Sequence, residues 1–408
     1  MHRSADTSVI SLQKNCDKAV DASTESIDCI EQSLFVFFFA NSKDYNETAD
    51  GSLSVGRRLV RHQTVRLLED RDAQGLSPED IADHNGRTVS ALLLREGPMT
   101  RQELAARLKL TEPAITGILQ RLLSAGLVCK GNRQTTTRYK AAEFSLVSSG
   151  AYGLGVERWQ TGGSLALCNL AGAMVLYQRF DQDEAFFAAV RQIVQAEVGF
   201  PAPIGVGVVM NADKDDAFTT AFGELPSFTL SKPEAVLAGE RLFGIGEPEG
   251  GLVVVLIDEQ VQAGLIINGR FYRGTHGRAG AIGAMRPGLA EGTLDVMASA
   301  ASYRAFIAEQ GESEVDRWIE QAASRLLDGV VTIAGFISPG AMLLGGQLPA
   351  DVIDRLIEKI ADIRLGKERY FVPAAWIPPL RPLSFPDRDA AYGAAIAPFI
   401  ELLLPKPN

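Results

Sequence analysis

The chain has 408 residues, of which 46% are hydrophobic, and its mean hydropathy is +0.04. A chain of this length and composition can bury the cores of about two to three domains, which excludes disorder along the whole chain. The formal net charge of −10 at pH 7 argues against a protein whose entire surface is coated by nucleic acid. No stretch approaches the ~18 apolar residues of a membrane span, since the most apolar segment, LFVFFFA at 34–40, is too short.

The four cysteines, Cys16, Cys29, Cys129 and Cys168, lie far apart without the spacing of a metal or disulfide motif. Reduced thiols in a cytosolic protein are the simplest interpretation. The chain also does not begin with the basic, then apolar, segment of a signal peptide. We therefore expect a cytoplasmic location and no membrane partner.

Residues 1–84 show little of the periodicity that is typical of a folded domain. We interpret them as a poorly defined N-terminal extension. The patterns that follow predict two domains, over 85–148 and 149–408.

Three short helices are predicted in the first of these domains. The first covers 88–95. The second begins at Thr100, which forms a capping box with Glu103. The third runs from 111 to about 124 and carries apolar residues at helical spacing along one face. These residues are Ile115, Ile118, Leu119 and Leu122.

Two short strands, 127–130 and 137–140, are predicted next, around a turn at Gly131-Asn132. Three helices followed by a small hairpin indicate a winged helix-turn-helix. In that geometry the third helix enters the major groove of double-stranded DNA.

Charge supports DNA as the partner of this domain. Between Arg87 and Lys140 there are ten Lys and Arg but three Asp and Glu, a local balance of +7, which leaves −17 for the rest of the chain. Two alternatives stay open: exposed polar residues on an ordinary helical bundle, and a winged helix that docks a protein. The side chains expected to reach bases or phosphates are Arg101, Thr111, Thr116, Gln120, Arg121, Lys130, Arg133, Arg138 and Lys140.

Beyond residue 150, strands and helices alternate in two similar sets. Three strands over 152–180, a helix over 185–197 and a strand over 204–210 form the first set. The second set begins with strands at 252–257 and 262–267 and continues through helices near 298–310 and 313–334. Two such halves in tandem predict a mixed α/β domain with a cleft between lobes.

Three stretches resemble the ROK family of repressors and sugar kinases. Residues 85–128, centred on MTRQELA, resemble the DNA-binding head of its repressors, and AGLIINGRFYRGTHGRAGAIG at 263–283 is similar to the family signature. Residues 342–346 match a late strand that ends in a glycine pair. The resemblance implies an α/β protein in which an N-terminal winged helix-turn-helix precedes a two-lobed, actin-like (ribonuclease H-like) ATPase-type domain. The lobes would cover about 149–230 with 385–408, and 231–384.

The chain departs from the family at the kinase positions. Lys232, in the stretch SKPEA, stands where ROK kinases carry the Asp that accepts a proton from the sugar hydroxyl, and a charged ammonium cannot accept one. Neither phosphate loop matches, since GVERW at 155–159 and DEQVQ at 258–262 stand in their places. Acidic residues there repel a nucleotide phosphate. Lys232 and Glu234 are expected to be solvated at a helix start.

The sugar and zinc positions are also changed. Ala281 and Ala284 replace the family's sugar-binding Glu and His, and Thr293 stands where the last zinc-ligating Cys is found. Asp295 matches a sugar-contacting Glu and is a candidate ligand-binding residue, with a helix N-terminal charge as the alternative. His276 is interpreted as a loop residue. We expect no metal and no cofactor.

The resemblance and the residues together indicate a DNA-binding transcriptional regulator, expected to repress, whose second domain senses or dimerises without catalysis. A homodimer and a sugar-like effector connected with carbohydrate metabolism are implied by the resemblance. Two alternatives are a sugar kinase with relocated catalytic residues and a winged-helix protein-interaction module.

Overall fold

The computed structural model describes residues 78–132, 142–195, 199, 201–210, 221–287, 292–366, 377–386, 388 and 390–405. Nearly all of the expected N-terminal extension, including Cys16 and Cys29, falls outside these ranges. None of the helices within them is both long enough and apolar enough to cross a membrane.

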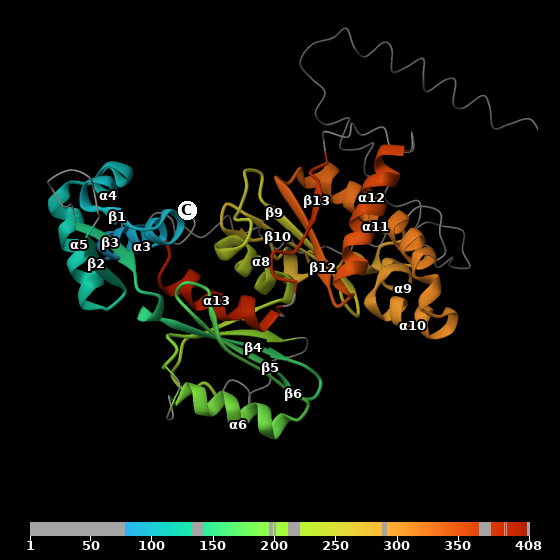
Figure 1. Cartoon of the computed structure of the whole chain (residues 1–408), viewed down its shortest axis with the longest axis horizontal. Helices are drawn as coiled ribbons and strands as arrows, with labels where there is room; N and C mark the ends of the chain where they lie inside the picture. The colour runs from blue at the N-terminus through green and yellow to red at the C-terminus, as the bar shows by residue number, and fades with distance from the viewer. Residues whose placement is uncertain are drawn as a thin grey trace, which may run out of the picture. The chain divides into compact units, whose positions relative to one another are not determined.

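The N-terminal elements form a winged helix-turn-helix, as the sequence predicted (Figure 1). Its helices share one buried core with the strand residues Val128 and Phe144. The strands form an antiparallel sheet in the order β1-β3-β2. The elements are α3 (Pro78–Glu96), β1 (Met99–Thr100), α4 (Arg101–Leu108), α5 (Glu112–Ser124), β2 (Val128–Asn132) and β3 (Ala142–Leu146).

Three features of this head differ from expectation. Strand β2 runs to Asn132, so Gly131 and Asn132, which were expected to form the turn, pair with β3 instead. Helix α3 begins at Pro78, ten residues before the expected start at Thr88. The sequence analysis missed this first half because it is polar and shows no apolar periodicity. The second wing strand is β3, whose Phe144 is buried in the head core. The segment 137–140, where that strand was expected, lies outside the described residues.

Local hydrogen bonds set the starts of α4 and α5. The Thr100 N–H donates to Glu103 Oε2 at 2.7 Å and the Glu103 N–H donates to Thr100 Oγ1 at 3.3 Å, which confirms the predicted capping box. Thr111 caps α5 in the same way, accepting from the Ala114 N–H at 3.4 Å. The four apolar residues predicted to line the inner face of α5 are all buried.

A five-stranded sheet in the order β6-β5-β4-β7-β8 forms the first lobe of the following domain. β4, β5 and β6 are antiparallel neighbours, whereas β7 and β8 run parallel to β4. Helix α6 covers one face and α13 the other (Figure 1). The elements are β4 (Tyr152–Arg158), β5 (Gly163–Asn169), β6 (Met174–Phe180), α6 (Asp183–Val194), β7 (Val206–Met210), β8 (Ser227–Leu230) and α13 (Ala390–Leu402).

The second lobe repeats this plan around a sheet in the order β11-β10-β9-β12-β13. Alternate residues of β9 face opposite ways: Val254 packs with Leu237 of α8, and Val255 packs in the core beneath α11 and α12. The two-lobed, actin-like α/β fold is thus as predicted. The elements are α8 (Lys232–Phe243), β9 (Leu252–Ile257), β10 (Val261–Ile267), β11 (Arg270–Phe271), α9 (Leu294–Ala298), α10 (Ala300–Gln310), α11 (Val315–Ile337), β12 (Ala341–Gly346), α12 (Ala350–Gly366) and β13 (Leu380–Pro382).

Glycines let α13 approach the first sheet and α8 unusually closely. A Cβ on Gly155 of β4 would collide with the carbonyl oxygen of Ala391, and one on Gly393 would collide with the carbonyl oxygen of Ala235 in α8. The neighbours are backbone atoms, which cannot move aside as a flexible side chain can. Helix α13 therefore packs backbone to backbone on both lobes.

Replacing Gly155 by Ala should destabilise the protein by about 1–3 kcal/mol, because the added methyl group overpacks this contact. Urea unfolding of the full chain would measure the change. Gly86→Ala in α3 is the matched control, since no atom lies within 4 Å of its added Cβ. The control should be stabilised by about 0.5–1 kcal/mol through reduced backbone entropy. Equal unfolding midpoints for Gly155→Ala and the wild type would contradict the described packing.

Cys168 on β5 should be unreactive in the folded protein. Burial raises the pKa of its thiol to about 12, although Arg388 acts in the opposite direction. Its reactive thiolate is therefore scarce at about pH 8, whereas Cys129 is exposed. Iodoacetamide followed by peptide mass mapping should find Cys129 alkylated and Cys168 spared, and urea should abolish the difference. Rapid native alkylation of Cys168 would refute its burial.

Candidate functional site

The outer surface of α5 carries the side chains expected to read DNA. Gln120 and Arg121 are exposed, and Thr116, one turn before Gln120, is half-buried and donates from Oγ1 to the Glu112 carbonyl at 2.8 Å. Thr111 lies exposed at the helix start, where its side chain caps the first turn. An α-helix that is buried on one side and polar on the other can enter a major groove with its polar side.

Arg101 of α4 lies against the start of α5. Its Nε is 3.3 Å from Glu112 Oε2, and its Nη1 donates to Thr116 Oγ1 at 3.4 Å. Two of the predicted residues, Arg101 and Thr116, are thereby brought together. No sequence motif indicated Glu112, although an acidic residue in the first turn of a helix is common because it interacts favourably with the helix dipole.

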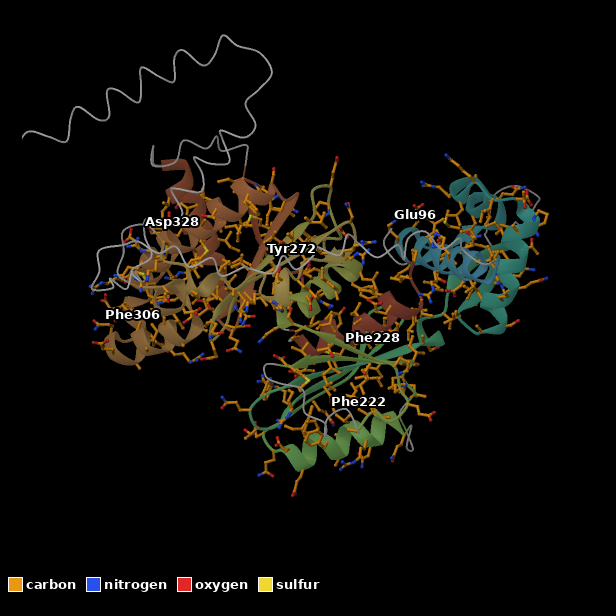
Figure 2. All side chains as sticks on the ribbon, turned by 180° about the vertical axis from the view of Figure 1, so that it is seen from behind. Glu96, Phe222, Phe228, Tyr272, Phe306 and Asp328 are labelled. Carbon is orange, nitrogen blue, oxygen red and sulfur yellow. The ribbon has the colours of Figure 1, made fainter. Side chains whose placement is uncertain are left out.

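Of the predicted wing residues, the structure describes Lys130, which is exposed on β2. Arg133, Arg138 and Lys140 lie outside the described residues. Glu96, at the end of α3, is labelled in Figure 2. Its Oε2 lies 2.9 Å from Nη2 of Arg107 in α4. Since Glu112 pairs with Arg101 in the same way, some of the basic charge of the head is already balanced by carboxylates.

A cavity of about 640 Å³ lies in the second domain, beside the start of α8. It is lined by β8, by the first turn of α8, by β10 and by the loop after β11, which includes the exposed Tyr272 (Figure 2). Ala281 and Ala284, at the two changed sugar positions, line it as well. Most of this lining is apolar, but Arg273, Arg278, Glu234 and Asp295 also contribute.

Glu234 organises one wall of the cavity. Its Oε2 accepts from the Ser231 N–H at 2.8 Å, which completes a capping box at the start of α8, and its Oε1 accepts from Arg273 Nε at 2.5 Å. The residue is 7% exposed. The expectation that Glu234 is solvated is therefore wrong, because it joins the helix cap to the family-signature loop.

Asp295 lies in the first turn of α9 and lines the cavity. Its Oδ1 accepts from the Val261 N–H at 2.7 Å, which fixes the start of β10. The carboxylate also packs closely on Gly283, so that a Cβ added there would displace it. Asp295 thus has a structural role, and its second oxygen is the atom that could contact a ligand.

Lys232 lies between two buried carboxylates. Its Nζ is 3.3 Å from Glu157 Oε1 and 3.1 Å from Asp258 Oδ2. Burial alone would lower the pKa of Lys232, but the charges of Glu157 and Asp258 outweigh burial and raise it. Lys232 is therefore a charged ammonium, and the expectation that it is solvated is wrong, since its side chain is 18% exposed.

His276, by contrast, is exposed in the loop after β11 and adopts a left-handed backbone conformation with φ of 57°. Among the described residues, no three His, Cys, Asp or Glu side chains are grouped so that they could hold a metal ion.

Comparisons with known proteins match both parts of the chain. Residues 75–128 match a family described as winged helix-turn-helix DNA-binding. A crystal structure of a ROK family transcriptional regulator, a homolog of the E. coli MLC protein, superposes with a TM-score of 0.63 at 18% identity, covering 79% of this chain and 98% of that one. The likeness shows that the two share a fold.

Two further proteins are similar to smaller shares of this chain. A ROK family protein from Streptococcus pneumoniae, crystallised with sucrose, gives a TM-score of 0.50 at 19% identity, over 60% of this chain and 97% of that one. The uncharacterized protein y4fQ of Sinorhizobium fredii is 24% identical over 77% of this chain and 90% of its own length. The resemblance to the ROK family found in the sequence is confirmed at the level of fold.

Arg101→Ala should change the free energy of unfolding by less than about 1 kcal/mol, because exposed ion pairs contribute little to stability. Arg101 and Glu112 are 49% and 45% exposed. Thermal unfolding of the variant, compared with Glu112→Gln and the wild type, would measure the effect. A loss several times larger would show that this pair holds α4 and α5 together.

Proposed function

We propose that this chain, in which a winged helix-turn-helix precedes a domain with the fold of ROK-family regulators, is a DNA-binding transcriptional regulator that acts as a repressor. The supporting observation is the division of α5 into a fully buried apolar face and an exposed face with Gln120 and Arg121. The match of 75–128 to a DNA-binding family supports the same conclusion.

The place of each polar side chain on the head determines which part of the duplex it would contact. Gln120 and Arg121, with Thr116, would face base edges, whereas Arg101 and Lys130 would contact phosphates. Thr111, at the start of α5, would contact the backbone. The wing residues Arg133, Arg138 and Lys140 complete the proposed phosphate contacts.

The domain over 149–408 would act as a sensor without kinase activity. At the position of the kinase base it carries an ammonium ion held by two carboxylates, and such a group has no lone pair with which to accept a proton. The cavity is the proposed effector site, with Asp295 at its wall. A sugar-like effector would have to bind without the family's Glu and His, which are Ala281 and Ala284 here.

The proposal includes a homodimer, because two heads on two half-sites multiply affinity. It also includes a cytoplasmic location, where the DNA of a bacterial-type regulator is found. The sequence placed the two functional domains at 85–148 and 149–408, and we extend the first back to Pro78, because α3 of the head begins there.

Binding to the promoter region of its own operon, followed by fluorescence anisotropy, tests the function. Affinity should fall with salt at a log–log slope of about −0.9 for each neutralised phosphate. Lys130→Ala should weaken binding to all duplexes and reduce the magnitude of that slope by about 1, because one phosphate contact is lost. Gln120→Ala should instead alter the preference among base substitutions in the site, by about 1–3 kcal/mol at the position it reads.

Lys359→Ala on α12 is the matched control, since this lysine pairs with Glu320 within the second lobe. It should bind DNA as the wild type does. Salt-independent binding, or Gln120→Ala and Lys130→Ala variants that both behave as the wild type, would contradict the proposed surface. ATP consumption with a sugar acceptor would instead support a kinase.

A further inference from the structure

Three separate departures from the ROK pattern meet at one point in the structure. Lys232 stands at the kinase base position, Glu157 lies in the stretch that replaces the first phosphate loop, and Asp258 begins the stretch that replaces the second. Their side chains form one cluster in which Lys232 Nζ is within 3.3 Å of both carboxylates. The sequence shows three losses, whereas the structure shows one new interaction.

The two carboxylates come from different lobes. Glu157 is on β4 of the first sheet, and Asp258 directly follows β9 of the second. Helix α8, which begins with Lys232, packs on β9 and β10 and also on α13, the helix that covers the first sheet. The ammonium therefore forms an ion pair with each lobe at the place where the two lobes meet.

Burial makes these ion pairs strong and mutually dependent. The side chains of Glu157 and Asp258 are 3% and 10% exposed, so water screens their charges poorly. Asp258 Oδ1 has no hydrogen-bond partner within the part of the chain that the structure describes. Without Lys232, two poorly solvated carboxylates would face each other across the lobes, which is costly.

We propose that Lys232 is an electrostatic latch: together with Glu157 and Asp258, it holds the two lobes closed with the chain's own cation. The inference goes beyond the proposed function, and it stands or falls independently of DNA binding. The latch lies where the family's kinases accommodate the reacting groups, so closure here needs no nucleotide.

The latch is also next to the cavity. Ser231, Pro233 and Glu234, the neighbours of Lys232 in the first turn of α8, line the cavity wall. A molecule bound at this wall would contact the turn that carries the latch. Occupancy of that wall would therefore act on lobe closure through one helical turn.

Spin labels on the two lobes would measure closure directly. Exposed Ala188 on α6 and exposed Ala308 on α10 would be replaced by Cys, in the full chain with its four native cysteines replaced by Ala. Lys232→Met, which keeps the length of the side chain and removes the charge, should shift the inter-label distance distribution to longer values and broaden it. Lys359→Met, which breaks the ion pair with Glu320 within one lobe, should leave the distribution unchanged.

The Lys232→Arg variant distinguishes an effect of the positive charge from an effect of the side chain's shape. The latch requires a cation, so the arginine variant should keep the short inter-label distance that the methionine variant loses. A purely steric role predicts the reverse order, because Met fits the space better than Arg. The distance is measured without DNA, so a failure of DNA binding would not affect the result.

If Lys232→Met does not fold, Glu157→Gln and Asp258→Asn decide the question, since each removes one arm and leaves the ammonium paired with the other. Each should give a longer or broader distance distribution than the wild type. Unchanged distributions in both single variants would overturn the proposal, and so would a Lys232→Arg variant as open as Lys232→Met.

Discussion

The close packing of α13 sets the geometry of the two-lobed domain. Because Gly155 and Gly393 have no Cβ, the backbone of α13 contacts the backbones of β4 and α8 directly. The helix therefore packs against both lobes. Helix α8 in turn packs on β9 and β10 of the second sheet. This chain of contacts places Lys232, at the first turn of α8, between the end of β4 and the end of β9. A bulkier residue at either glycine would move the ammonium relative to its two carboxylates, and buried ion pairs tolerate little displacement.

Local patterns in the sequence predicted the elements well, whereas long-range pairings could not be predicted. The apolar spacing in α5 and the capping box at Thr100 are encoded within a few residues, and the structure has both. The start of α3 was missed because its first half is polar. The sequence also did not indicate strand β3 at Ala142–Leu146, which is recognised mainly by the burial of Phe144. The ion pairs of Arg101 and Lys232 join residues that are distant in the sequence, so no periodicity marks them. The pairs of Lys232 also changed its interpretation, since it had been expected to be solvated.

The cavity shows how a binding site can be altered without loss of the fold around it. Alanines stand at the positions of two polar sugar contacts, and Asp295 has one oxygen committed to the start of β10. Glu234 is likewise engaged by its own helix cap and by Arg273. Other polar side chains of the lining, among them Thr229, Gln260 and Gln262, lie beside the apolar part of the surface. A sugar-like effector would therefore have to pair its hydroxyl groups with side chains other than the family's Glu and His, because unpaired buried polar groups are costly.

Glu112 has a consequence for how a regulator of the proposed kind would search a chromosome. Its carboxylate sits at the tip of the helix that would enter the groove and already occupies Arg101. Every stretch of duplex presents the same phosphates, so this carboxylate weakens attachment to all of them alike. The proposed base contact of Gln120 would be gained at matching sites alone. The ratio of affinity for the matching site to affinity for other sites would therefore rise, and a regulator of this kind would spend less time bound at the other sites.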